Sequence, residues 1–230
     1  MNETDRFFSS RVQAGRMLAR ELGYVKGSDC IVYALPRGGV VTAVEIATYL
    51  RSPLELLLTR KIVHPLSPEY AQAAISEKGY LVSSKISREQ MLEGWFEEAI
   101  QKQIAEIARR RLMYSAGKKR MRATGKTAII VDDGVATGLT LRAGILEIRD
   151  EDPLKLIVAV PVIPESTAEL IKNSVDDLVA LSIPSDQDYL GAVGSYYEDF
   201  HEISDREVIK ILEDFAYSSK EYSSFERRAL

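Results

Sequence analysis

Apolar residues near the start of the chain first recur at helical spacing and then gather in short continuous runs. The first helical stretch has Thr4 as a candidate N-cap and Gly23 as a candidate stop. The first apolar run is short and ends at Pro36, which is typical of a buried strand. The predicted elements are, in order, helix 5–22, strand 30–35, helix 40–50 and strand 54–59.

The pattern changes between residues 61 and 88, where short strand-like pieces are separated by turn residues. The pieces are 61–68, 73–76 and 80–82, with a hairpin turn at Glu77, Lys78 and Gly79. A long amphipathic helix over 87–113 follows. Long excursions of this kind in a compact domain often act as lids. We therefore expect residues 61–115 to form an inserted lid hairpin and a long helix.

After residue 126 the chain returns to alternating apolar runs and helical stretches. The predicted elements are strand 127–131, helix 137–149, strand 154–162, helix 165–173 and strand 178–183. Residues 185–200 are rich in Asp, Gly and Tyr and indicate a loop. Ser204 and Glu207 then fit a capping box that opens a last helix to about residue 215. Strands that alternate with helices predict a single α/β domain over residues 1–230, with a central, mostly parallel sheet and helices on both faces.

The composition excludes several classes of protein. Of 230 residues, 46% are hydrophobic and 28% are charged, and 30 Lys and Arg against 34 Asp and Glu give a net charge of -4. These values argue against disorder and fibrous repeats, and the mild acidity argues against a general DNA-coating protein. No apolar run approaches the ~20 residues of a membrane span, and the polar N-terminus has no signal-peptide core. The single cysteine, Cys30, lies in an apolar run, so we expect a reduced, cytoplasmic setting.

The strongest chemical signal is the segment 129–140, in which an apolar strand ends in two acids and a loop of small residues leads into a helix. Small residues let backbone N–H groups approach an anion, and a helix N-terminus favours negative charge. Thr137 and Thr140 add hydroxyl donors, so this part suits a phosphate. Asp132 and Asp133 would repel a phosphate but can accept hydrogen bonds from vicinal sugar hydroxyls. The segment predicts a cradle for a ribose 5-phosphate; the alternative is that the two acids only cap the helix.

This string of hydrophobic residues, two acids, small residues and Thr-Gly-x-Thr resembles the phosphoribosyl-diphosphate (PRPP) signature of the type I phosphoribosyltransferases. The layout of nearly the whole chain is similar to a group of uncharacterised bacterial and archaeal phosphoribosyltransferase-like proteins. The resemblance implies the type I fold, with the site at the carboxyl ends of the parallel strands. It also implies a hood over the site, which we place at 184–203 together with parts of both termini.

Two further segments fit the diphosphate of PRPP. In the family, the loop after the first core strand holds this group, and here that loop carries an arginine and two glycines. In the family, the second strand leads into a loop that closes over PRPP, and here two cations stand at that hinge. The alternatives are an ordinary strand-to-helix turn and a solvated strand end. The residues that we assign to the diphosphate are Pro36, Arg37, Gly38, Gly39, Arg60 and Lys61.

The resemblance implies exchange of the diphosphate at C1 of PRPP for a ring nitrogen of a nucleobase, with Mg²⁺ carried on the diphosphate. Such a reaction belongs to nucleotide metabolism. Asp132, Asp133 and Lys61 are the candidate catalytic residues, and the two acids contact the metal only through PRPP. The residues that we assign to the ribose and 5-phosphate are Asp132, Asp133, Gly134, Val135, Ala136, Thr137, Gly138, Leu139 and Thr140.

Three features bear on the acceptor and the lid. Tyr189, Tyr196 and Tyr197 are candidates to stack on a base in the hood, or else they are core edges. Ala136 stands where the family's hypoxanthine and guanine enzymes carry a third acid, so the loop is closer to the adenine and orotate enzymes. The segment 72–75 lacks a glycine that we expect in the lid.

Other functions fit the same sequence. A basic run without acids suggests a PRPP-sensing regulator that binds RNA, and its plainer interpretation is a solvated helix end. The run comprises Arg109, Arg110, Arg111, Lys118, Lys119, Arg120, Arg122 and Lys126. Hydrolysis or phosphorolysis of a phosphoribosyl compound is a third function for the same cradle. In each case we expect a homo-oligomer, most simply a dimer.

Overall fold

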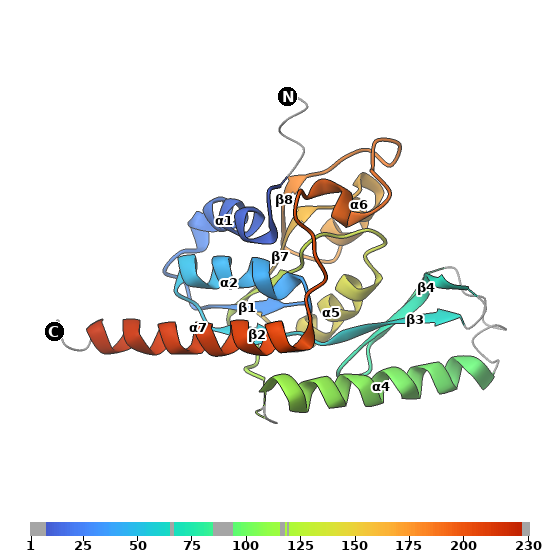
Figure 1. Cartoon of the computed structure of the whole chain (residues 1–230), viewed down its shortest axis with the longest axis horizontal. Helices are drawn as coiled ribbons and strands as arrows, with labels where there is room; N and C mark the ends of the chain where they lie inside the picture. The colour runs from blue at the N-terminus through green and yellow to red at the C-terminus, as the bar shows by residue number, and fades with distance from the viewer. Residues whose placement is uncertain (1–7, 65–66, 85–93, 116–117, 119, 227–230) are drawn as a thin grey trace.

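The computed structural model, which describes residues 8–64, 67–84, 94–115, 118 and 120–226, has a sheet of five parallel strands at its centre. The strands are β1 (Cys30–Ala34), β2 (Leu54–Leu56), β6 (Thr127–Val131), β7 (Lys155–Val162) and β8 (Asp177–Ser182). They lie in the order β2-β1-β6-β7-β8 (Figure 1). The predicted fold class, an α/β protein built on a central parallel sheet, is confirmed.

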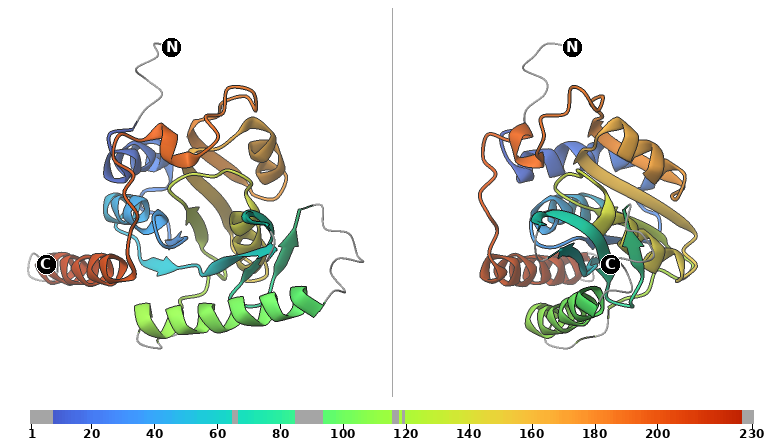
Figure 2. Two further views of the ribbon diagram at one scale, coloured as in Figure 1. Left: turned by 45° about the vertical axis from the view of Figure 1, so that its right-hand side comes forward. Right: turned by 90° about the vertical axis from the view of Figure 1, so that its right-hand side faces the viewer.

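Helices cover both faces of this sheet, as Figure 2 shows. They are α1 (Arg11–Glu21), α2 (Gly39–Leu50), α5 (Leu139–Arg149) and α6 (Glu165–Lys172). Because side chains alternate along a strand, Val32 and Ala34 of β1 pack with α1 and α2, whereas Ile31 and Tyr33 pack with α5 and α6. Burial on both faces explains why β1 and β6 are apolar along nearly their whole length.

A second sheet and a long helix are inserted between β2 and β6. The elements are β3 (Thr59–His64), β4 (Ser67–Ser76), β5 (Leu81–Ser83) and α4 (Gly94–Ser115). Antiparallel pairing in the order β3-β4-β5 confirms the predicted hairpin. The predicted single strand over 54–59 is wrong, because the chain leaves the main sheet after β2 and pairs β3 with β4 instead. The predicted start of the long helix, 87–93, lies outside the described residues.

The turn between β4 and β5 is bound to α5. Lys78 donates its backbone N–H to Glu147 Oε2 (3.0 Å), and its Nζ lies 2.8 Å from Glu151 Oε1. Arg120 bonds to both carboxylates, at 2.8 and 2.7 Å. Both glutamates are buried, so these bonds compensate charges that would be costly to bury alone. The inserted hairpin is therefore fixed to α5, the helix that follows Asp132 and Asp133.

The first helix begins later than the sequence predicts. Ser10 is the N-cap of α1, and its Oγ accepts a hydrogen bond from the Gln13 N–H (3.3 Å). The predicted cap, Thr4, lies outside the described residues. Gly23 does not stop the helix as predicted, because the chain continues into a short 3-10 helix, η2 (Leu22–Val25).

The C-terminal part carries the predicted hood segment and a helix longer than expected. Phe8 forms an isolated parallel β-bridge with Tyr197, which places Phe8 beside the segment 184–203. The predicted capping box is confirmed, since the Glu207 N–H donates to Ser204 Oγ (3.2 Å). The helix, α7 (Asp205–Glu226), runs past residue 215 and extends beyond the body of the molecule (Figure 1). Nowhere in the described part of the chain is a helix both long and apolar enough to cross a bilayer.

Candidate functional site

Asp132 and Asp133 directly follow β6, the central strand of the sheet. The Asp133 N–H donates to Asp132 Oδ1 (2.9 Å), so the two acids form one turn at the carboxyl end of the strand. Burial, and then the charge of Asp133, raise the pKa of Asp132 well above its ordinary value, while the charge of Lys61 acts in the opposite direction. The fold therefore disfavours the charged form of Asp132.

Asp133 has a cation of its own, Arg11, which the sequence analysis missed. Arg11 Nε lies 2.7 Å from Asp133 Oδ2, and the two side chains are only 8% and 15% exposed. The guanidinium also donates to the His201 carbonyl (2.9 Å) and lies 3.7 Å from the centroid of the Phe200 ring. One signal could have identified it, because Arg11 precedes the buried Ala14 by three residues and so shares its helical face.

The loop after the acids is held in place from both sides. The Val135 N–H donates to the Val162 carbonyl at the end of β7 (2.8 Å). The Thr167 hydroxyl of α6 donates to the Ala136 carbonyl (2.9 Å). Gly134 has φ +149°, and a Cβ at this position would lie 2.3 Å from a side-chain carbon of the hood. The small residues of this loop are therefore needed for its path.

The N-terminus of α5 is open to a ligand. Gly138 is its N-cap, in a left-handed conformation, and no side chain caps the helix. Asp132 and Asp133 therefore do not cap α5, which contradicts the alternative interpretation of the motif. Ala136 and Thr137 are exposed beside these free N–H groups. A helix N-terminus with free donors and an adjacent hydroxyl suits a phosphate.

The predicted diphosphate loop lies directly against the two acids. A Cβ on Gly38 would lie 1.8 Å from Asp133 Oδ2, and a Cβ on Gly39 would lie 3.0 Å from Asp132 Oδ1. Only glycine fits such an approach, so the two segments that the sequence analysis selected separately meet in space. The peptide bond that joins Pro36 to the next residue is cis.

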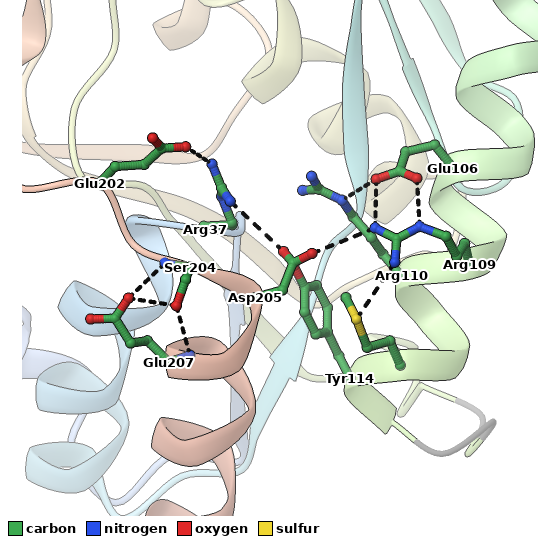
Figure 3. Close-up of polar contacts among 10 residues, drawn as sticks. Arg37, Glu106, Arg109, Arg110, Tyr114, Glu202, Ser204, Asp205 and Glu207 are labelled. Atoms are coloured by element: carbon green, nitrogen blue, oxygen red, sulfur yellow. Dashed lines mark hydrogen bonds and ion pairs between the residues drawn. The ribbon is translucent and has the colours of Figure 1, made fainter.

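Arg37 of this loop is bound to the C-terminal segment. It pairs with Glu202, and its Nη1 lies 4.0 Å from Asp205 Oδ1 (Figure 3). Asp205 is the first residue of α7, and Glu202 precedes that helix. The sequence analysis missed both carboxylates, because charge alone does not show which distant residue an arginine will meet.

The two cations of β3 differ in their surroundings. Arg60 Nε donates to Gln103 Oε1 of α4 (3.0 Å), and burial is the main cause that lowers its pKa. Lys61 is exposed, and its charge acts to lower the pKa of Asp132. The structure thus brings Lys61 near the acids and places Arg60 against the inserted helix.

Residues 10–198 of the chain match the family model of the phosphoribosyl transferase domain. The chain belongs to the type I phosphoribosyltransferase family. The matched residues include both acids, the loop that follows them and the Arg37 loop, so the family predicted from the sequence is confirmed.

Relatives of this family member are similar along most of the chain. A presumed phosphoribosyl transferase of Mycobacterium tuberculosis, found in two strains, is 37% identical over 217 residues, which are 92% of this chain and 48% of that protein. The chain thus spans about half the length of the curated relatives it matches. A crystal structure from Thermus thermophilus is 35% identical, covers 91% of this chain and 99% of that one, and has a TM-score of 0.74.

The tyrosines assigned to the base pocket lie in the segment 184–203, which the sequence predicts to be a hood. Tyr196 is buried, and its hydroxyl accepts a hydrogen bond from the Leu190 N–H (3.1 Å). Tyr197 is also buried, and its hydroxyl donates to the Asp133 carbonyl (2.6 Å). For these two residues the contacts favour the packing alternative. Tyr189 stacks on Tyr196, but its hydroxyl has no hydrogen-bond partner among the described atoms, so it stays a candidate for the base.

Most of the basic run is engaged with acids. The pairs are Arg109 and Arg110 with Glu106, Arg111 with Glu77, Arg120 with Glu147 and Glu151, and Lys126 with Asp29. Lys119 lies outside the described residues. Cations that are already paired attract a polyanion less strongly, so this arrangement favours a structural role over an RNA surface.

The chemistry of the acids fits a metal that arrives with its ligand. Within the described ranges, no three His, Cys, Asp or Glu side chains gather into a metal-binding group. Asp133 is neutralised by Arg11, whereas Asp132 forms no ion pair among the described residues. That Asp132 and Asp133 contact Mg²⁺ only through PRPP stays a prediction.

Proposed function

We propose that the protein transfers the 5-phosphoribosyl group of PRPP to a nucleobase or similar nitrogen acceptor and releases diphosphate. One observation carries this proposal. The loop with Gly38 and Gly39 lies against Asp132 and Asp133, beside a helix N-terminus that no side chain caps. A site with phosphate donors on one side, acceptors for a diol in the middle and a glycine loop opposite is complementary to PRPP.

Each part of PRPP has its own residues in this proposal. The 5-phosphate binds to the backbone N–H groups at the start of α5 and to the hydroxyls of Thr137 and Thr140. The ribose hydroxyls donate to Asp132 and to the remaining lone pairs of Asp133. Gly38, Gly39 and the cations Arg37, Arg60 and Lys61 hold the diphosphate.

The reaction exchanges one bond at C1 for another. The bond from C1 to the diphosphate oxygen breaks, and its electron pair leaves with the diphosphate. The lone pair of the acceptor nitrogen forms the new bond on the opposite face, so C1 is inverted, and the proton of that nitrogen passes to water. Positive charge develops on the ribose in the transition state, and the carboxylate of Asp132 stabilises it. Mg²⁺, when bound, neutralises charge on the leaving diphosphate.

The acceptor in this proposal is a nitrogen base whose proton is not taken up by a carboxylate at position 136. Ala136 is exposed in the loop and offers no proton acceptor. The Tyr189 hydroxyl, which is buried and has no hydrogen-bond partner among the described atoms, is the group in this segment that we assign to the base. We propose, as expected from the sequence, that the protein acts as a cytoplasmic homodimer.

A screen of nucleobases with PRPP and Mg²⁺, measured as diphosphate release, tests the proposed function. A transferase releases diphosphate only when its base is present. A hydrolase releases it without any base. A regulator that only senses PRPP binds it but releases nothing with any base, and this result would contradict the transferase assignment.

PRPP with Mg²⁺ should also stabilise the folded protein. At ~100 times its Kd, a ligand adds about 2.7 kcal/mol to the free energy of unfolding, which corresponds to an increase in Tm of about 5–10 °C for a chain of this size. Thermal scans with and without PRPP measure this shift, and glucose 6-phosphate serves as the control. An unchanged Tm at millimolar PRPP would rule out the PRPP cradle in all its versions.

A further inference from the structure

Arginines from three elements gather beside the predicted diphosphate loop. Arg37 follows β1, Arg60 belongs to β3, and Arg109 and Arg110 belong to α4. Burial is the main cause that lowers the pKa of Arg60. The positive charges of Arg110 and Arg37 lower it further, so these cations act on one another. Like charges placed this close are costly unless an anion lies among them.

The two neighbouring arginines of α4 differ in how far they are satisfied. Every nitrogen of the Arg109 guanidinium has a partner, in Glu106, Asp205 or Met113. Among the described residues, Arg110 donates through Nε alone, to Glu106 Oε1 (2.7 Å). Figure 3 shows its terminal nitrogens turned away from Glu106, toward the side on which Arg37 lies. Arg110 is 13% exposed against 54% for Arg109, so its terminal donors belong to the less accessible of the two side chains.

The two carboxylates at Arg37 also differ. Asp205 accepts a hydrogen bond from the Tyr114 hydroxyl, contacts Arg109 at 3.5 Å and lies at the N-terminus of α7. Glu202 lies outside helices and strands, its side chain is 81% exposed, and its one ion pair in the described part of the chain is with Arg37. An exposed pair of this kind contributes little to stability. Glu202 is therefore the carboxylate that a ligand anion can displace from Arg37.

We propose that Arg110 joins Arg37 and Arg60 in binding the ligand's diphosphate, and that Glu202 is an internal anion which the diphosphate displaces from Arg37. This inference rests on the proposed function, and it adds a binding residue from the inserted helix. Without Glu202, the acids that pair with these arginines in the described part of the chain are Glu106 and Asp205. The excess of positive charge that results suits a diphosphate, which arginine binds through two parallel hydrogen bonds.

Inorganic diphosphate without Mg²⁺ is the probe, and calorimetry gives its Kd. Arg110→Met should weaken binding about 10- to 100-fold, because it removes charge-assisted hydrogen bonds to the ligand. Arg109→Met is the matched control, since it removes a neighbouring arginine that shares the Glu106 partner. We expect it to change the Kd by less than about fivefold.

A second pair of variants tests the internal anion. Glu202→Gln should tighten diphosphate binding about two- to fivefold, because the competing carboxylate is gone. Glu198→Gln removes an exposed carboxylate from the same segment and should leave the Kd within about 1.5-fold of the wild type. In an Arg37→Met background, Glu202→Gln should lose its effect.

Equal losses for the two arginine variants would overturn the role of Arg110, and equal Kd values for the two glutamate variants would overturn the role of Glu202. If Arg110→Met does not fold, as judged by circular dichroism, Arg110→Gln against Arg109→Gln gives the same comparison. The thermal shift with PRPP separates this inference from the proposed function. If PRPP raises the Tm but the paired variants do not differ in Kd, the proposed function stands and this inference is wrong. If the variants differ in Kd but PRPP does not raise the Tm, the protein has an anion site and the proposed function is wrong.

Discussion

Arg11→Met should lower the free energy of unfolding by about 3–5 kcal/mol. The expected loss is large because Arg11 and Asp133 are both nearly inaccessible to water and lie 2.7 Å apart. Without the guanidinium, Asp133 is left as a buried charge with no cation, and the His201 carbonyl loses its donor. Urea unfolding followed by circular dichroism measures the difference.

Arg16→Met is the control for this experiment. Arg16 belongs to the same helix and pairs with Glu45 at 2.9 Å, but its side chain is 66% exposed. We expect it to change stability by only ~0–1 kcal/mol. Combining Arg11→Met with Asp133→Asn should recover about half of the loss or more, since no buried charge then remains. Equal effects of Arg11→Met and Arg16→Met would show that the pair with Asp133 does not support the site.

Asp132→Asn should reduce kcat about 10²- to 10³-fold and at the same time raise the thermal stability of the protein. The loss of rate follows from removing the negative charge that faces the developing cation at C1. The gain in stability follows from the raised pKa of Asp132, which means that the fold disfavours its charged form. Single-turnover kinetics and thermal scans measure the two effects on the same sample.

The pH dependence of stability gives this prediction a direction. The folded state holds the proton of Asp132 more tightly than the unfolded state, so protonation stabilises the fold. This stabilisation is complete below the ordinary carboxyl pKa and is lost as the pH rises through the raised value. Asparagine resembles the protonated acid, so the advantage of Asp132→Asn should be largest at neutral pH and shrink toward acidic pH.

Asp133→Asn provides the contrast, because it leaves Arg11 without its carboxylate. We expect this variant to be less stable than the wild type, whereas Asp132→Asn is more stable. If both variants are destabilised alike, the two acids share the same environment and the division between them is wrong.

The parts of the site that are local in sequence were predictable. The strand, the two acids and the open helix N-terminus occupy one continuous segment, and its hydrophobic pattern and small residues specify them together. The sequence also predicted that Gly38 and Gly39 allow a close approach, but it assigned that approach to a diphosphate and not to the two acids that the glycines contact.

Contacts between distant residues could not be predicted. Arg11 and Asp133 are separated by 122 positions, and Arg37 and Glu202 by 165. Periodicity reports which face of an element is buried, but it does not report which charges meet across a sheet. The same limit explains the error at 54–59, where a continuous apolar run divides between two sheets, because strand pairing depends on the partner strands rather than on the run itself.

The bonds from Lys78 to Glu147 and Glu151 make the hairpin turn part of the folding unit of the core. A hairpin that projects from a domain ordinarily opens locally, at little cost, from its exposed turn. Here opening the turn removes the Lys78 donors from two buried carboxylates, Glu147 in α5 and Glu151 just after it, so local unfolding there costs more than at an unattached turn. The β4–β5 turn should therefore open less readily than a hairpin turn that is exposed to solvent.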